Sequence, residues 1–302
     1  MKRLLRFTIA FLALFTTLGI YTTNRIMFIK NKNEEEILKR DEEAGLLKLT
    51  EFNALPKREI SILSPYGYSL NATVVEPWQT NRYMIFCHGV TESKLSSVKY
   101  MNLFINRGYN AVIYDQRRHG DSGGKTTSYG FYEKFDLKAV VDWLKEDRKG
   151  KNLFFGIHGE SMGAATMLQY AGMLEDTAAF YIADCPYSDF REQLSYRVKE
   201  DVKLPPKMML PIASLFLKIR DRYPLKVVSP IAAVENIAKP VLFIHSKSDD
   251  YILPHMTEKL FAQKKGPKQL FLAENGVHAR SLTENQKEYE EVLDDFLKKY
   301  VL

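Results

Sequence analysis

The chain has 302 residues, of which 45% are hydrophobic and 26% charged, as in an ordinary globular protein with a sizeable core. A formal charge of +6 would permit a nucleic-acid partner, but acidic residues are interspersed with the basic ones and no nucleic-acid-binding motif is present. We therefore predict no nucleic-acid partner. The two cysteines, Cys87 and Cys185, lie far apart in apolar runs, which indicates two buried thiols and no disulfide framework.

The first predicted element is an apolar helix near the N-terminus. Residues 7–24 form an uncharged stretch of 18 residues that follows three basic residues, and this is just long enough to cross a bilayer. A cleaved signal peptide is the competing interpretation, but no Ala-x-Ala site follows the stretch. The basic residues before it place the N-terminus in the cytoplasm and the rest of the chain outside. We predict a single-pass membrane anchor in residues 1–30 and a charged linker without chemistry in residues 31–50.

A folded domain is expected over residues 51–302, and it begins with a β-hairpin at residues 59–63 and 69–75. Predicted strands and helices then alternate. The strands lie at residues 83–87, 110–114, 153–158, 179–183, 241–245 and 269–272, and the helices include residues 96–107, 135–146 and 286–300. This pattern predicts an α/β fold with a mostly parallel eight-stranded sheet and helices on both faces. In such sheets ligands bind at the carboxyl ends of the strands.

The central motif is Gly-Glu-Ser-Met-Gly at residues 159–163, between an apolar strand and a helix that starts with small residues. A strand, a sharp turn and a helix in this order are typical of a nucleophile elbow, in which a strained serine points its Oγ to solvent. Gly159 and Gly163 remove the Cβ atoms that would hold strand and helix apart. A serine that merely caps the helix is the alternative. We identify Ser161 as the candidate nucleophile.

Two more glycine-containing turns follow predicted strands. The first reads His-Gly-Val-Thr, and the backbone N–H groups of Val90 and Met162 would together form an oxyanion hole. A simple tight turn is the alternative. The second, residues 115–124, is glycine-rich but lacks the spacing of a phosphate-binding loop. We interpret it as a structural turn braced by a pair between Asp115 and Arg117.

A serine nucleophile needs a general base and a carboxylate that orients it, and the C-terminal part of the chain offers both. Asp249 and Asp250 follow the strand at residues 241–245, and they compete for the role of the acid. His278 lies in the loop before the last helix, and the one other histidine after the aspartates is His255, at a helix start. The order serine, aspartate, histidine is that of α/β-hydrolases.

Residues 186–239 form an insert that is too long for a plain crossover, and we interpret it as a helical cap that shapes the pocket. Its apolar centre, residues 208–217, contains methionines, whose flexible side chains can adapt to different acyl chains. Residues 191–226 carry nine basic and four acidic side chains, a net charge of +5. Beside a membrane anchor, this charge indicates a cap that faces an anionic membrane. A solvated basic face is the alternative.

No metal or cofactor site is predicted. The chain contains no CxxC and no HExxH pattern. His88, His119, His158 and His245 lie at strand ends or turns, where structural hydrogen bonds are expected. We therefore predict neither a metal ion nor a cofactor, and the sequence leaves the oligomeric state open.

Five of these pieces together resemble the serine hydrolases of the α/β-hydrolase superfamily. They are His88-Gly89, residues 115–122, residues 159–163, Ile244-His245 followed by Asp249, and Gly276-Val277-His278. The resemblance runs from Phe52 to the C-terminus and is greatest to N-terminally anchored bacterial members near the monoacylglycerol lipase, cinnamoyl esterase and serine aminopeptidase branches. In that pattern the acid stands four residues after the histidine that ends the strand, which selects Asp249 over Asp250.

The resemblance implies a serine hydrolase of the carboxylesterase or lipase type. Ser161, His278 and Asp249 would cleave a small-molecule or lipid-like acyl ester through an acyl-enzyme intermediate. Peptidase or thioesterase action on the same triad stays open, because only the cap and pocket decide between them. A binding protein that kept the fold and lost the chemistry is the alternative of another class, and the complete set of five pieces argues against it.

Overall fold

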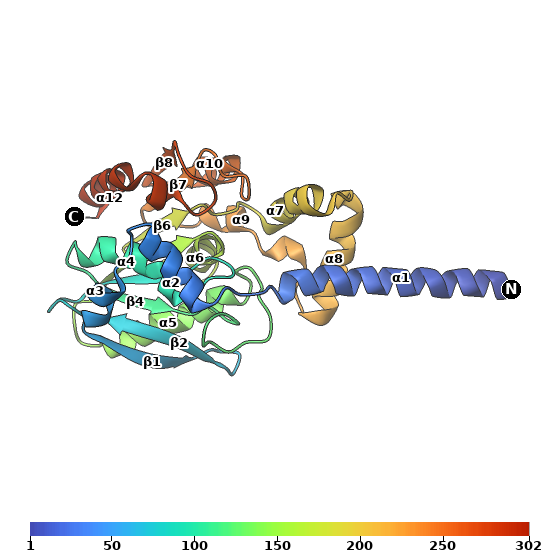
Figure 1. Cartoon of the computed structure of the whole chain (residues 1–302), viewed down its shortest axis with the longest axis horizontal. Helices are drawn as coiled ribbons and strands as arrows, with labels where there is room; N and C mark the ends of the chain where they lie inside the picture. The colour runs from blue at the N-terminus through green and yellow to red at the C-terminus, as the bar shows by residue number, and fades with distance from the viewer. Residues whose placement is uncertain (302) are drawn as a thin grey trace.

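An eight-stranded sheet lies at the centre of the computed structural model, which describes residues 1–301 (Figure 1). The strand order is β1-β2-β4-β3-β5-β6-β7-β8. Strand β2 is antiparallel to both β1 and β4, and the other pairs are parallel. The strands are β1 (Lys57–Leu63), β2 (Ser69–Val75), β3 (Arg82–Cys87), β4 (Asn110–Tyr114), β5 (Phe154–Glu160), β6 (Phe180–Asp184), β7 (Val241–Ser246) and β8 (Lys268–Ala273). The predicted α/β fold is confirmed.

Helices cover both faces of this sheet, as predicted. Helices α5 (Glu133–Asp147), α6 (Met162–Met173) and α10 (Pro254–Gln263) contribute to the core on one face, and α4 (Val98–Ile105) and α12 (Gln286–Tyr300) to the core on the other. Alternate residues of a strand point to opposite faces, so Ile85 belongs to one core and Phe86 to the other. The central strands therefore read as continuous apolar runs.

The remaining helical elements lie before the sheet, in its connections and in the insert. They are α1 (Lys2–Met27), α2 (Glu34–Glu43), α3 (Leu49–Ala54), η1 (Lys94–Ser97), α7 (Phe190–Arg197), η2 (Val198–Val202), α8 (Pro206–Arg220), η3 (Leu225–Val227), α9 (Pro230–Val234) and α11 (Ser281–Glu284). Both cysteines are free and buried, in agreement with the prediction of two buried thiols.

Helix α1 extends far from the globular body (Figure 1). It is the one helix among residues 1–301 that is long and apolar enough to cross a membrane. Its last turn packs on the predicted cap, because Ile26 and Met27 belong to the same buried cluster as Met209 and Leu217 of α8. The helix is therefore docked at its C-terminal end and exposed along most of its length.

The contacts that hold the turn after β4 differ from the predicted pair of Asp115 with Arg117. Asp115 accepts hydrogen bonds from the backbone N–H groups of Lys94 at 2.7 Å and Asp121 at 3.2 Å. Arg117 instead lies over the ring of Tyr132, with 4.3 Å between its Cζ and the ring centroid. The predicted pair between Asp115 and Arg117 is wrong, because backbone donors surround the carboxylate and the guanidinium finds an aromatic face.

A buried ion pair fixes the end of β5, where the candidate nucleophile follows. Lys99 Nζ lies 2.9 Å from Glu160 Oε2, and both side chains are 5% exposed. The hydroxyl of Tyr100 donates to the same oxygen at 2.7 Å. Burial raises the pKa of Glu160, but the charge of Lys99 and these hydrogen bonds outweigh burial and lower it to about 2. Two neighbouring residues of α4 therefore hold the carboxylate ionised inside the protein.

Replacing Lys99 with methionine should destabilise the fold, because the Glu160 carboxylate would stay buried without its opposite charge. Removing one partner of a buried pair costs about 3–5 kcal/mol of free energy of unfolding, which urea denaturation at pH 7 measures. The pKa of Glu160 is about 2 in the fold against an ordinary 4.5, so this stabilisation is present above pH 4.5 and is lost as the pH falls toward 2. The difference in free energy of unfolding between the wild type and Lys99→Met should therefore become smaller as the pH falls from 4.5 toward 2.

Lys149→Met is the matched control, since the Lys149 side chain is 75% exposed beside Glu146. Exposed pairs of this kind contribute little to stability. If the two variants were equally stable at pH 7, the buried pair would not be what holds the end of β5.

Candidate active site

Ser161 stands between β5 and α6 with a φ of 55° and a ψ of −115°. A positive φ is strained for a residue other than glycine and costs about 1–3 kcal/mol. The flanking glycines make the turn possible. A Cβ on Gly163 would lie 2.0 Å from the carbonyl oxygen of Cys87, and one on Gly159 would lie 2.5 Å from the backbone of Ala164. The predicted strand, turn and helix are present, and Ser161 makes no side-chain capping hydrogen bond to α6.

The structure brings Ser161, His278 and Asp249 together. Ser161 Oγ lies 2.9 Å from His278 Nε2, and His278 Nδ1 lies 2.7 Å from Asp249 Oδ2. The three residues follow β5, β8 and β7, so they meet at the carboxyl ends of parallel strands. Asp250 is exposed, and its carbonyl oxygen accepts hydrogen bonds from Tyr196 and Arg197. The geometry therefore places Asp249, and not Asp250, against the imidazole.

Asp249 is held as a carboxylate from several sides. Its Oδ1 accepts hydrogen bonds from the N–H groups of Tyr251 and Ile252, each at 2.9 Å. His245 Nε2 lies 3.0 Å from its Oδ2. Burial raises the pKa of Asp249, but the hydrogen bonds of His245 and His278 outweigh burial and hold that pKa well below its usual range. His245 was expected to make only structural hydrogen bonds, and its contact with Asp249 was missed because it depends on how the loop folds back on β7.

Val90 and Met162, the predicted oxyanion-hole donors, both line the cavity at Ser161. The loop that carries Val90 is fixed by a buried histidine, because the N–H of Thr91 donates to His119 Nε2 at 3.2 Å. Burial lowers the pKa of His119 to about 3. The imidazole is therefore neutral at ordinary pH and can keep accepting this hydrogen bond.

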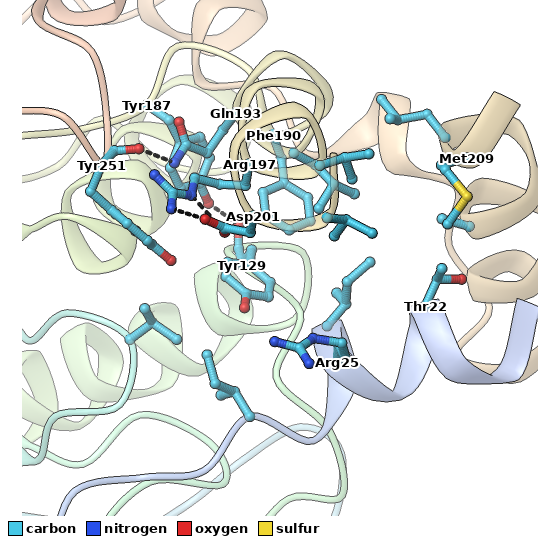
Figure 2. Close-up of a pocket in the computed structure, with 18 of the residues that line it drawn as sticks. Thr22, Arg25, Tyr129, Tyr187, Phe190, Gln193, Arg197, Asp201, Met209 and Tyr251 are labelled. Carbon is cyan, nitrogen blue, oxygen red and sulfur yellow. Dashed lines mark hydrogen bonds and ion pairs between the residues drawn. The ribbon is translucent and has the colours of Figure 1, made fainter. Parts of the chain in front are cut away.

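An apolar cavity of about 210 Å³ opens from Ser161 toward α1 and the predicted cap (Figure 2). The residues of the body and cap that line it include Tyr129, Tyr187, Phe190, Leu194, Met209, Leu210 and Ala213. Helix α1 adds Tyr21, Thr22, Arg25 and Ile26. This contribution from α1 could not be predicted from the sequence, because the apolar pattern indicates a membrane span or a signal peptide and says nothing of what the end of the helix contacts.

A second cavity, of about 480 Å³, meets the first at Ser161 and Val90 and is lined by charged groups. They are Lys32, Arg40, Asp41, Glu92, Lys99, Glu160 and Arg280. Glu92 Oε1 lies 2.8 Å from Arg40, whereas its buried Oε2 has no hydrogen-bond partner within residues 1–301. The segment predicted as a linker without chemistry thus supplies charges beside the candidate nucleophile. Its charge pattern alone could not reveal that α2 folds back onto the body.

One group of side chains has donor atoms close enough to share a metal ion. Among residues 1–301, Cys185, Asp249 and His278 bring theirs within 4.8 Å of one another. Burial raises the pKa of the Cys185 thiol well above its ordinary value, whereas metal ions bind the thiolate. Both ring nitrogens of His278 are already engaged by Ser161 and Asp249. This donor set suits a hydrogen-bonded triad better than a metal site.

Known proteins resemble the chain over nearly its whole length. A family model described as serine aminopeptidase, S33, matches residues 79–227. The uncharacterized protein YqkD of Bacillus subtilis is 49% identical over 298 residues, which cover 98% of this chain and 97% of that protein. Identity and coverage of this size place the two chains in one family.

More distant relatives have named activities. The lysophosphatidylserine lipase ABHD12 of Xenopus tropicalis is 24% identical over 74% of this chain and 60% of its own length. The solved esterase Pf2001 of Pyrococcus furiosus superposes with a TM-score of 0.69 over 85% of this chain and 97% of its own, at 22% identity, which compares the fold alone. From its sheet, its elbow and these relatives, the chain belongs to the α/β-hydrolase superfamily.

Proposed function

We propose that the protein is a serine hydrolase that cleaves acyl esters through an acyl-enzyme on Ser161. The observation that carries the proposal is the continuous line of contacts from Ser161 Oγ through His278 to Asp249, at 2.9 and 2.7 Å. His278 would take the hydroxyl proton as Ser161 attacks the ester carbonyl, and then give it to the leaving alcohol. In the second half-reaction it would activate a water molecule in the same way.

Negative charge would develop on the carbonyl oxygen during attack. The N–H groups of Val90 and Met162 are the proposed donors to that oxygen, and both residues line the cavity at Ser161. Met162 is also the first residue of α6, where the positive end of the helix dipole favours an anion. Asp249 would keep the imidazole in one tautomer and offset the charge that it gains.

The two cavities that meet at Ser161 support an amphiphilic ester as the substrate. The apolar cavity would take the acyl group, and the charged cavity beside Arg40 and Glu92 would take a polar alcohol group. The name of the relative ABHD12, a lysophosphatidylserine lipase, supports an ester of this kind. A peptidase on the same triad is the second candidate, favoured by the description of the matching family model. Matched esters, amides and thioesters of one acyl group would decide between the candidates.

We also propose that α1 is a single-pass anchor and that the folded domain lies outside the cytoplasm. The length and apolar character of the exposed part of α1 support the anchor. The three basic residues that precede the apolar stretch support the orientation. The net charge of +5 in residues 191–226 would hold the cap near anionic lipids.

Ser161→Ala should lower kcat for p-nitrophenyl butyrate at least about 10³-fold and leave the circular dichroism spectrum unchanged. A fluorophosphonate probe should label the wild type and not this variant. Ser61→Ala, at an exposed position of β1, is the matched control and should keep full activity and labelling. If Ser161→Ala still hydrolysed the ester, the proposed mechanism would be wrong.

Asp249→Asn should lower kcat about 10⁴-fold, because the imidazole would lose the carboxylate that orients it. Asp250→Asn makes the same chemical change at the neighbouring, exposed side chain and should cost far less. The comparison uses p-nitrophenyl butyrate with both variants at equal concentrations of folded protein. Equal losses, or the larger loss at Asp250, would mean that the geometry at His278 does not govern the reaction.

The full chain should stay with membranes through a high-salt wash and dissolve only in detergent, because an apolar span and not surface charge would hold it. Intact mass measurement of the extracted protein should give the 34.9 kDa of the whole chain. A shortened protein in the soluble extracytoplasmic fraction would show instead that the N-terminal segment is a cleaved signal.

A further inference from the structure

The C-terminal turns of α1 form one side of the apolar cavity at Ser161. Thr22 and Ile26 stand one helical turn apart and both line it, as do Ser161 and Met162. Figure 2 shows Thr22 projecting from α1 toward Met209 of the cap, and Arg25 of α1 also lines the cavity. This side of the cavity therefore exists only while α1 is in place.

The position of α1 is fixed by close packing. A Cβ on Gly19 would lie 2.3 Å from the ring of Phe216 in α8, so the two helices are in direct contact at that point. Arg220 of α8 donates to Asn24 Oδ1 at 2.7 Å. On the body side, the N–H of Thr127 donates to the carbonyl oxygen of Met27 at 3.0 Å. The turns between Gly19 and Met27 are therefore a rigid part of the site.

The packing of α1 on α8 reaches as far as Phe15, whose ring lies 5.7 Å from that of Phe216. The uncharged residues 7–24 span about 27 Å at a rise of 1.5 Å per residue, close to the roughly 30 Å of a bilayer's hydrocarbon core. If they cross the membrane, α8 lies at its surface. Three exposed apolar side chains of α8, Met208, Leu215 and Ile219, fit that position, at 51%, 46% and 67% exposure. The cavity then lies between Ser161 and the lipid, along the anchor itself.

We propose that α1 is a specificity element as well as an anchor, with Thr22 and Ile26 forming the wall that selects the length of the substrate's acyl chain. The proposal rests on the proposed function, because it places the acyl group of the ester in this cavity. A short acyl group fills the part beside Ser161 and Met162. A longer chain continues past Ile26 and Thr22 along α1, so side-chain volume at these positions sets how much chain the site accepts.

The test uses the full chain in detergent micelles and a graded series at one position, Thr22→Val, Thr22→Leu and Thr22→Trp. The quantity measured is the ratio of kcat/KM for p-nitrophenyl dodecanoate to kcat/KM for p-nitrophenyl acetate. We expect this ratio to fall stepwise with side-chain volume, and at least tenfold for Thr22→Trp. The rate at which a long-chain alkyl fluorophosphonate labels Ser161 should fall in parallel, relative to a short-chain one.

Ile20→Trp is the matched control, because Ile20 lies on the same helix, is 42% exposed and does not line the cavity. Its ratio should equal that of the wild type. An unchanged ratio across the folded Thr22 variants, or the same change for Ile20→Trp, would overturn the role of α1 and leave the esterase proposal intact. No Ser161-dependent hydrolysis of any ester by the wild type would overturn both. The Thr22→Val and Thr22→Leu variants keep the series informative if the tryptophan is not tolerated.

Discussion

The site depends on one backbone constraint, the strained turn at Ser161. Its positive φ is unfavourable, and three contacts hold it. The N–H of Ser161 donates to the carbonyl oxygen of Asp184 in β6 at 2.8 Å. Helix α6 approaches β3 so closely that Gly163 has no room for a Cβ. The buried pair of Glu160 and Lys99 ties the end of β5 to α4. Three strands and two helices thus hold the turn, and the serine hydroxyl is oriented before any ligand binds.

The same arrangement separates two environments on either side of Ser161. Toward α1 and α8 the walls are mainly aromatic and aliphatic, and toward α2 many of their side chains are charged. Charges such as Arg40 and Glu92 stay beside the nucleophile because they are paired with each other. A single acyl ester with an apolar and a polar end would match both walls at once, which is why the proposed substrate follows from the site and not from the fold alone.

Much of the fold was predictable, because each buried strand is an apolar run and several of the turns between elements contain a glycine. The candidate triad could also be predicted, since its members follow predicted strands. The resemblance selected Asp249 over its neighbour Asp250. What the sequence could not give are contacts between distant segments. The pair of Arg40 with Glu92, the approach of His245 to Asp249 and the docking of α1 on α8 each depend on tertiary packing that no local pattern records. The same reason explains the wrong pairing of Asp115 with Arg117.

The burial of both cysteines has a consequence for the compartment in which the domain would work. An oxidising environment favours disulfide formation, and an accessible thiolate is needed for it. Burial raises the pKa of Cys87 to about 12 and that of Cys185 well above its ordinary value. Neither sulfur is exposed or ionised, so the folded domain is redox-inert although it contains two unpaired thiols. Serine-directed and thiol-directed reagents should for the same reason act on this protein very differently.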